Sequence, residues 1–324
     1  MQKRLRILFA GSPAIAVPAL EAAVALCDEG EGFALASLLT NPDTPKGRNG
    51  KLEPTECAAA LERLHSIPIL KPEKLDGEVR TQVQALEPDL LVSFAYGKIF
   101  GPKFLDLFPM GGINVHPSLL PKYRGPTPIP AAIINGEAET GITIQRLALE
   151  MDSGDILAQE KVPLNGWETT ASLSETMAKK AAMLLPEVLK DIGAAGAAHG
   201  RAQDHGAASY CSLIAKADGM IDWGMGATEI NARIRAYTPW PLSWTTHGDQ
   251  QLLILKAKVA HSQERSDQAR PGEVLGKDKN MGILIQTGEG VLAVSELQYR
   301  TKKPLEWQAF LNGARNFIGE TLGV

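Results

Sequence analysis

The sequence predicts an α/β protein: a doubly wound, mostly parallel Rossmann-like sheet, followed by a smaller C-terminal β-barrel domain that is OB-like. The first part of the 324-residue chain alternates apolar, strand-like runs with stretches of helical spacing, which is typical of a parallel sheet flanked by helices. The last part contains short alternating runs at close spacing, which favour a small barrel. The chain is also about twice the usual domain length, so two domains are expected.

The first domain is expected to span residues 1–192. Its helices are expected at 15–27, 54–65, 77–87 and from Thr170 to Leu189, the last of them capped by Thr169 or Thr170. Its strands are expected at 5–10, 33–39, 67–70, 89–95, 112–116, 141–149 and 156–162. Open sheets of this kind bind ligands beyond the carboxyl ends of their strands.

A change of composition separates the two domains. Residues 193–211 are rich in Ala, Gly and His and lack large apolar side chains, so they are expected to form a linker. The second domain is then expected to span residues 212–324. Its helices are expected at 227–236 and 305–312, and its strands at 242–247, 251–259, 272–276, 282–287 and 291–298.

Composition excludes several classes of protein. With 44% hydrophobic and 22% charged residues, and no apolar run near the roughly 18 residues of a membrane span, the chain is expected to be cytoplasmic, without a membrane partner. Its basic start is followed by too few apolar residues for a secretory signal. Three widely separated cysteines indicate neither a disulfide framework nor a metal site. The net charge of −4 leaves room only for a local nucleic-acid-binding patch.

The segment INVHPSLLPKYRGPTPI, residues 113–129, holds the first candidate site. Asn114 and His116 are two residues apart on a strand, so they point to the same face. An amide donor beside an imidazole suits the stabilisation of a negative oxygen on an attacked carbonyl. The alternative interpretation is that both side chains only bond neighbouring backbone at a strand end.

The segment MDSGD holds the second candidate, because Asp152 and Asp155 flank a tight Ser-Gly turn. A carboxylate near His116 could accept the proton that an attacking amine loses. An ordinary Asp-rich turn between strands is the alternative. The AGSP turn after the first strand lacks the glycine fingerprint of dinucleotide sites, so a nucleotide cofactor is disfavoured.

The segment TNPDTPKGRNGKLEP, residues 40–54, is rich in Pro, Gly and Asn, so an irregular loop is expected. It carries Lys46, Arg48 and Lys51. A flexible basic loop can reach a phosphate backbone. A solvated loop with scattered charge is the alternative.

Together these segments resemble the folate-dependent formyltransferases. The resemblance covers nearly the whole chain and rests on an ordered set of motifs: ILFAGSP, PDTPKGR, VSFAYGKI, NVHPSLLPKYRG, ETGITI, EMDSGDIL, IDW and IRAYTPWPLSW. Thr44, Pro117, Ser12 and Ala14 depart from residues that are common in the family.

The resemblance implies roles for particular residues. The catalytic trio falls on Asn114, His116 and Asp152, and no metal is involved. The co-substrate is 10-formyltetrahydrofolate, whose expected contacts are Ser118, Leu119, Leu120, Pro121, Phe94, Ala95, Tyr96 and Gly97. The loop with Lys46, Arg48 and Lys51 would contact the tRNA acceptor stem.

The acceptor implied by the resemblance is the free amino group of methionine on charged initiator tRNA, in translation initiation. The catalytic loop alone does not name this acceptor, because HPSLLP also occurs in glycinamide ribonucleotide formyltransferases. The second domain points to tRNA, since IRAYTPWPLSW and the barrel-like tail are absent from those shorter enzymes. The alternative is a formyltransferase acting on an amino sugar nucleotide or another small amine. A monomer is expected.

Overall fold

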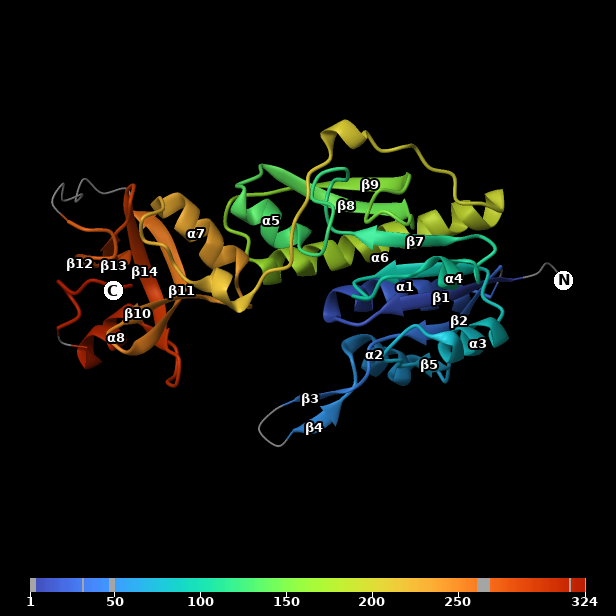
Figure 1. Cartoon of the computed structure of the whole chain (residues 1–324), viewed down its shortest axis with the longest axis horizontal. Helices are drawn as coiled ribbons and strands as arrows, with labels where there is room; N and C mark the ends of the chain where they lie inside the picture. The colour runs from blue at the N-terminus through green and yellow to red at the C-terminus, as the bar shows by residue number, and fades with distance from the viewer. Residues whose placement is uncertain (1–3, 31, 47–49, 261–268, 315, 324) are drawn as a thin grey trace. The chain divides into compact units, whose positions relative to one another are not determined.

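The structure is a computed structural model and describes residues 4–30, 32–46, 50–260, 269–314 and 316–323 (Figure 1). The chain divides into two compact units. Unit 1 consists of residues 1–128, 139–163 and 174–211, and unit 2 of residues 129–138, 164–173 and 212–324. Each unit has its own sheet.

The sheet of unit 1 has seven strands in the order β5-β2-β1-β6-β7-β8-β9. Its strands are β1 (Leu5–Gly11), β2 (Phe33–Leu39), β5 (Ile69–Leu70), β6 (Leu90–Phe94), β7 (Gly112–His116), β8 (Glu139–Arg146) and β9 (Ile156–Pro163). The first five are parallel to one another, β8 is antiparallel to β7, and β9 is antiparallel to β8. The order runs outward from β1 in both directions, so the sheet is doubly wound and its switch point lies between β1 and β6.

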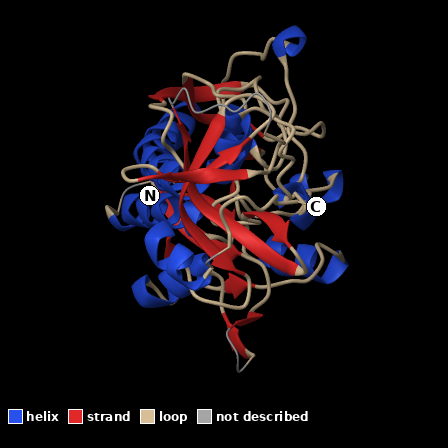
Figure 2. Ribbon diagram, turned by 90° about the vertical axis from the view of Figure 1, so that its left-hand side faces the viewer, coloured by secondary structure: helices blue, strands red, loops and turns tan. Residues whose placement is uncertain are grey.

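Helices flank this sheet, as Figures 1 and 2 show. One apolar cluster joins Leu8 and Ala10 of β1 to Val79 and Val83 of α3 and to Phe104 of α4. Alternate β1 residues point to this face because strand side chains have a period of two. The helices of unit 1 are η1 (Ala14–Ala16), α1 (Val17–Asp28), α2 (Glu56–Leu64), α3 (Gly77–Ala85), α4 (Pro102–Leu105), η2 (His205–Ala207) and most of α6 (Thr170–Ala195).

Two short strands lie inside the predicted irregular loop at 40–54. β3 (Thr44–Lys46) pairs with β4 (Lys51–Glu53) in an antiparallel hairpin, with Lys46 opposite Lys51. The hairpin projects from the body of unit 1 in both views (Figures 1 and 2). All of β4 is exposed. The expectation of a wholly irregular loop was therefore wrong, because a two-stranded ribbon needs only backbone pairing and shows no apolar alternation.

Unit 2 contains one antiparallel sheet in the order β10-β11-β14-β13-β12, with β15 paired to β14. Its strands are β10 (Ser243–His247), β11 (Gln250–Ala260), β12 (Val274–Asp278), β13 (Gly282–Gln286), β14 (Val291–Tyr299) and β15 (Leu305–Glu306). Its helices are α5 (Pro128–Ile134), η3 (Lys216–Gly219), α7 (Ala227–Ala236) and α8 (Trp307–Gly313). The register shifts on both sides of Lys256, where a bulge bends β11.

The predicted fold class is confirmed as a mostly parallel sheet with flanking helices, followed by a smaller antiparallel sheet domain. Helix α6 begins where predicted, since the Thr169 hydroxyl accepts a hydrogen bond from the Ser172 N–H at 3.2 Å. The domain limits 1–192, 193–211 and 212–324 stay a prediction, as does closure of the second sheet into a barrel. Residues 193–211 group with unit 1 and contain the buried side chains of Ala198 and Gln203.

Candidate active site

Strand β7 positions two of the predicted catalytic side chains. Asn114 and His116 alternate with buried Val115, so both leave the same face of the sheet. The antiparallel register sets Gln145 of β8 opposite Asn114, and Thr143 opposite His116. This part of the sheet therefore carries four polar side chains in two cross-strand pairs.

Asp152 lies on the turn between β8 and β9 and has a left-handed backbone, with φ of 52°. Aspartate tolerates this region better than most residues, since its short polar side chain can bond nearby backbone. The neighbouring Gly154 has no room for a side chain, because a Cβ there would lie 1.9 Å from the Arg146 carbonyl oxygen. The Ser-Gly turn is thus a requirement of close backbone packing.

The three predicted catalytic side chains converge. The Asn114 Nδ2 atom lies 3.4 Å from Asp152 Oδ1, and the His116 Nδ1 atom lies 3.6 Å from Asp152 Oδ2. The side chains of His116 and Asp152 are 5% and 14% exposed, so the pair is shielded but not sealed. Both distances exceed the 2.7–3.2 Å typical of N–H···O bonds. A substrate oxygen could compete for either donor.

Stronger bonds fix the Asp152 carboxylate. The Gly125 N–H donates to Oδ2 at 2.9 Å, and the Gln145 Nε2 atom donates to Oδ1 at 2.9 Å. Each of these partners is a donor, so both carboxylate oxygens act as acceptors. Burial raises the pKa of the nearby Cys211 thiol, and the Asp152 charge raises it further.

The bonding of His116 fixes one of its protons. Its Nε2 atom lies 2.8 Å from the Tyr123 carbonyl oxygen, which can only accept, so Nε2 carries a hydrogen. Nδ1 then faces the Asp152 carboxylate.

Hydrogen bonds within unit 1 fix the loop at 118–121, and few of its side chains are exposed to a ligand. Ser118 and Leu120 are buried, and the Leu120–Pro121 peptide is cis. The Thr143 hydroxyl donates to the Ser118 carbonyl at 2.7 Å and accepts the Leu120 N–H at 3.2 Å. Only Leu119 and Pro121 are partly exposed, so folate contacts here would come from these two side chains and the backbone.

The segment 94–97 follows β6 at the switch point of the sheet. Phe94 and Tyr96 are buried, and the Tyr96 ring belongs to the apolar cluster under α3 and α4. Burial raises the pKa of Tyr96 to about 12. Ala95 and Gly97 are exposed, and a side chain at Gly97 would meet nothing within 4 Å. The folate contacts expected at this segment stay a prediction.

Two of the three predicted basic residues lie on the strands of the hairpin, Lys46 on β3 and Lys51 on β4. Lys46 and Lys51 pair across it, and Lys51 is exposed. Arg48 lies outside the described residues.

Several polar residues near the candidate site carried no local sequence signal. Arg124 is 1% exposed, and its Nη2 atom donates to Gln203 Oε1 at 2.9 Å. Gln203 lies in the predicted linker, yet it donates to the Asp152 carbonyl oxygen at 2.9 Å. Gln145 could have been noticed, because it continues the polar positions of ETGITIQR at period two.

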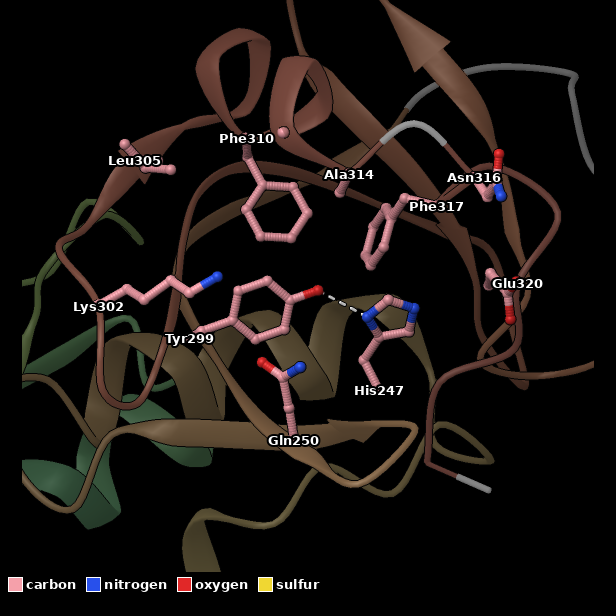
Figure 3. A pocket seen from close by; sticks show the side chains of 11 residues that line it. His247, Gln250, Tyr299, Lys302, Leu305, Phe310, Ala314, Asn316, Phe317 and Glu320 are labelled. Carbon is pink, nitrogen blue, oxygen red and sulfur yellow. Dashed lines mark hydrogen bonds between the residues drawn. The ribbon is translucent and has the colours of Figure 1, made fainter.

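Unit 2 has a cavity of about 440 Å³, shown in Figure 3. Four residues with aromatic rings line it, and they are called the aromatic cluster below: His247, Tyr299, Phe310 and Phe317. His247 Nδ1 lies 2.7 Å from the Tyr299 hydroxyl, and Phe310 and Phe317 meet edge to face at 5.0 Å. The Lys302 amine lies 5.0 Å from the centre of the Tyr299 ring. None of these residues is among the predicted site residues.

The described residues contain no group of three or more His, Cys, Asp or Glu side chains that could hold a metal ion. They also contain no helix long and apolar enough to cross a membrane.

The family profile described as "Formyl transferase" matches residues 5–189, and that described as "Formyl transferase, C-terminal domain" matches residues 213–315. Methionyl-tRNA formyltransferase of Treponema denticola is 48% identical over 323 residues, covering 97% of this chain and 98% of that protein. The protein of the same name from Treponema pallidum (strain Nichols) is 43% identical over 327 residues, covering 99% and 100%.

A similar solved structure is the N-formyltransferase from Helicobacter canadensis in complex with folinic acid and dTDP-3-aminofucose. It superposes with a TM-score of 0.64 at 18% identity, covering 90% of this chain and 99% of that one. At this identity the likeness is one of fold. The two family profiles and the full-length relatives carry the assignment: the chain belongs to the formyl transferase family, with the methionyl-tRNA formyltransferases as its relatives.

Proposed function

We propose that this chain transfers the formyl group of 10-formyltetrahydrofolate to the free amino group of methionyl initiator tRNA, as a monomer in the cytoplasm. The observation that carries the proposal is similarity at 48% identity to a methionyl-tRNA formyltransferase along 97% of the chain. The convergence of Asn114, His116 and Asp152 supplies the chemistry that such a transfer needs.

The neutral amine attacks the formyl carbon, and the carbonyl oxygen becomes negative as the new C–N bond forms. Asn114 Nδ2 and a protonated His116 Nδ1 are the donors for this oxygen, since their contacts to Asp152 are long at 3.4 and 3.6 Å. Asp152 stabilises the imidazolium and accepts the proton that the amine loses. Collapse of the intermediate breaks the bond to the folate nitrogen, which receives the proton held by Asp152, and tetrahydrofolate is released.

Folate is proposed to lie between the 94–97 segment and the 118–121 loop. The exposed backbone at Ala95 and Gly97 is suited to the pterin edge, and Leu119 and Pro121 offer apolar contact. The protein supplies shape and hydrogen bonds here, while the formyl group comes with the folate.

An acceptor assay tests the proposal. The chain is given 10-formyltetrahydrofolate with either methionyl initiator tRNA or a dTDP-linked amino sugar. Efficient formylation of methionyl-tRNA is expected. Transfer to the amino sugar alone would show that the acceptor is a small amine and not tRNA. Absence of transfer to either amine would reject the enzyme assignment.

The hairpin β3–β4 is proposed to contact the tRNA acceptor stem. Lys51 is exposed on a projecting ribbon, as a phosphate contact requires. Loss of one such contact lowers the slope of log K against log salt by about one unit. Lys51→Ala should show this change in tRNA binding, with Glu53→Gln as the matched control on the same strand. An unchanged slope would remove Lys51 from the interface.

A further inference from the structure

A buried cation lies near the candidate site without touching the trio. Arg124 is 1% exposed, and the carboxylate that forms an ion pair with it, Glu150, lies at 4.0 Å. Its Nε and Nη2 atoms both donate to Gln203 Oε1, at 3.2 and 2.9 Å. Its Nη1 atom reaches the Tyr210 hydroxyl at 3.3 Å. A guanidinium group has donors and no acceptor, so its partners must accept.

This requirement sets the orientation of two amides. Because Gln203 presents its oxygen to Arg124, its Nε2 atom faces the other way, 3.2 Å from Gln145 Oε1. Because Gln145 accepts there with its oxygen, its own Nε2 faces Asp152 Oδ1 at 2.9 Å. The guanidinium at one end and the carboxylate at the other require the same orientation of both amides. The bonds all point from the cation towards the anion.

Gln203 also holds the backbone of the catalytic turn. Its Nε2 atom lies 2.9 Å from the Asp152 carbonyl oxygen and 2.6 Å from that of Gly154. Asp152 has a left-handed backbone that few residues adopt unaided. One buried amide therefore restrains both the torsions of Asp152 and, through Gln145, its carboxylate.

The segment that carries Gln203 is tied to the loop that carries Arg124. The Arg124 N–H donates to the Ser209 carbonyl at 2.8 Å, and the Cys211 N–H donates to the Arg124 carbonyl at 2.8 Å. A side chain at Gly125 would meet the Cys211 carbonyl oxygen at 2.3 Å. These contacts fix the segment that carries Gln203 against the loop that carries Arg124.

We propose that Arg124, Gln203 and Gln145 form a polar relay whose function is to position Asp152 as a hydrogen-bond acceptor beside His116. They are positioning residues: they act through Asp152 and touch no reacting atom. The inference rests on the proposed role of Asp152 in formyl transfer. It assigns function to a residue of the 193–211 segment.

The decisive variant is Gln203→Glu. It keeps the shape and the oxygens that Arg124 needs, but it removes the N–H donors that reach Gln145, Asp152 and Gly154. A displacement of about 1 Å at a reacting group costs about 10²-fold in rate. We expect kcat to fall by about that factor, with the KM for folate little changed. Tyr210→Phe removes an Arg124 contact outside the relay and should leave kcat close to wild type.

A double-mutant cycle separates positioning from general damage. In an Asp152→Asn background, Gln203→Glu should cost little further, because interacting residues give non-additive losses. A full second loss in that background would overturn the proposal. So would wild-type kcat in a folded Gln203→Glu enzyme.

If Gln203→Glu does not fold, Gln145→Met replaces it in the same cycle. This variant removes the amide between Gln203 and the Asp152 carboxylate, at similar size. A fall in kcat that disappears in the Asp152→Asn background supports the relay, and wild-type kcat rejects it. The cycle is measured with whichever amine the wild-type chain formylates, so a wrong acceptor leaves this test intact.

Discussion

The polar centre of unit 1 and the aromatic cluster of unit 2 both assemble side chains that are distant in sequence. The polar centre, Asn114, His116, Gln145 and Asp152, is held by short directional bonds to Asp152 and from His116, which allow one arrangement of donors and acceptors. The aromatic cluster, His247, Tyr299, Phe310 and Phe317, is held mainly by ring packing. A directional network can therefore lose activity to a change of a single atom, whereas a packed cluster responds to lost volume.

The largest effect expected in this comparison is on stability. Phe317→Ala removes a ring that is 1% exposed and should lower the free energy of unfolding by about 3–5 kcal/mol. Urea unfolding measures the loss, with Phe317→Leu as a milder control. The kcat of the folded variant should equal that of the wild-type protein. A fall in kcat with unchanged stability would mean that the aromatic cluster takes part in turnover.

Asn114→Ala should lower turnover and leave stability nearly unchanged. Removing one donor to a developing oxyanion costs about 10²–10³ in turnover, or about 3–4 kcal/mol of transition-state stabilisation. Stability and folate binding should change little, since the bond of Asn114 to Asp152 is long at 3.4 Å. Steady-state kinetics with folate titration make the measurement. Weaker folate binding at unchanged kcat would reject the assigned role.

Thr143→Val tests the fixed loop at 118–121. The substitution keeps the volume but removes the hydroxyl that donates to the Ser118 carbonyl and accepts from the Leu120 N–H and Gln159 Nε2. Leaving a buried polar group unpaired costs about 1–3 kcal/mol. We expect the KM for folate to rise more than kcat falls. Thr143→Ser retains the hydroxyl and should restore most of the KM, whereas equal defects in both variants would point to packing.

The smallest effect is expected for Tyr299→Phe. It removes the hydroxyl that bonds His247 at 2.7 Å and leaves the ring in the cluster. A single hydrogen bond contributes about 0.5–1.5 kcal/mol, so thermal unfolding should shift only slightly. If the loss matched that of Phe317→Ala, the aromatic cluster would depend on directional bonding as strongly as the polar centre does.

Local sequence patterns predicted the elements better than the contacts between them. Strands β2 and β7 and helix α7 have the predicted limits, because apolar alternation and helical spacing extend along their whole length. The hairpin β3–β4 lacks such a pattern and was not predicted. Helix α5 was missed as well, since its sequence PIPAAII contains two prolines and suggests a loop.

The candidate site shows the same limit. The spacing of Asn114 and His116 was enough to predict that they share a face. Their proximity to Asp152 followed from the family resemblance, because nothing local joins residues so far apart in sequence. Gln203 lies among Ala, Gly and His residues with no periodicity, and its partners are set only by the tertiary fold.

The left-handed torsion of Asp152 decides how its carboxylate can be studied. Asparagine adopts a φ near 52° readily, so Asp152→Asn removes the carboxylate and leaves the backbone conformation unchanged. Alanine adopts this left-handed conformation at a cost of about 1–2 kcal/mol. Asp152→Ala would therefore combine a change in the turn with the loss of the base, and its kinetic effect could not be attributed to either one.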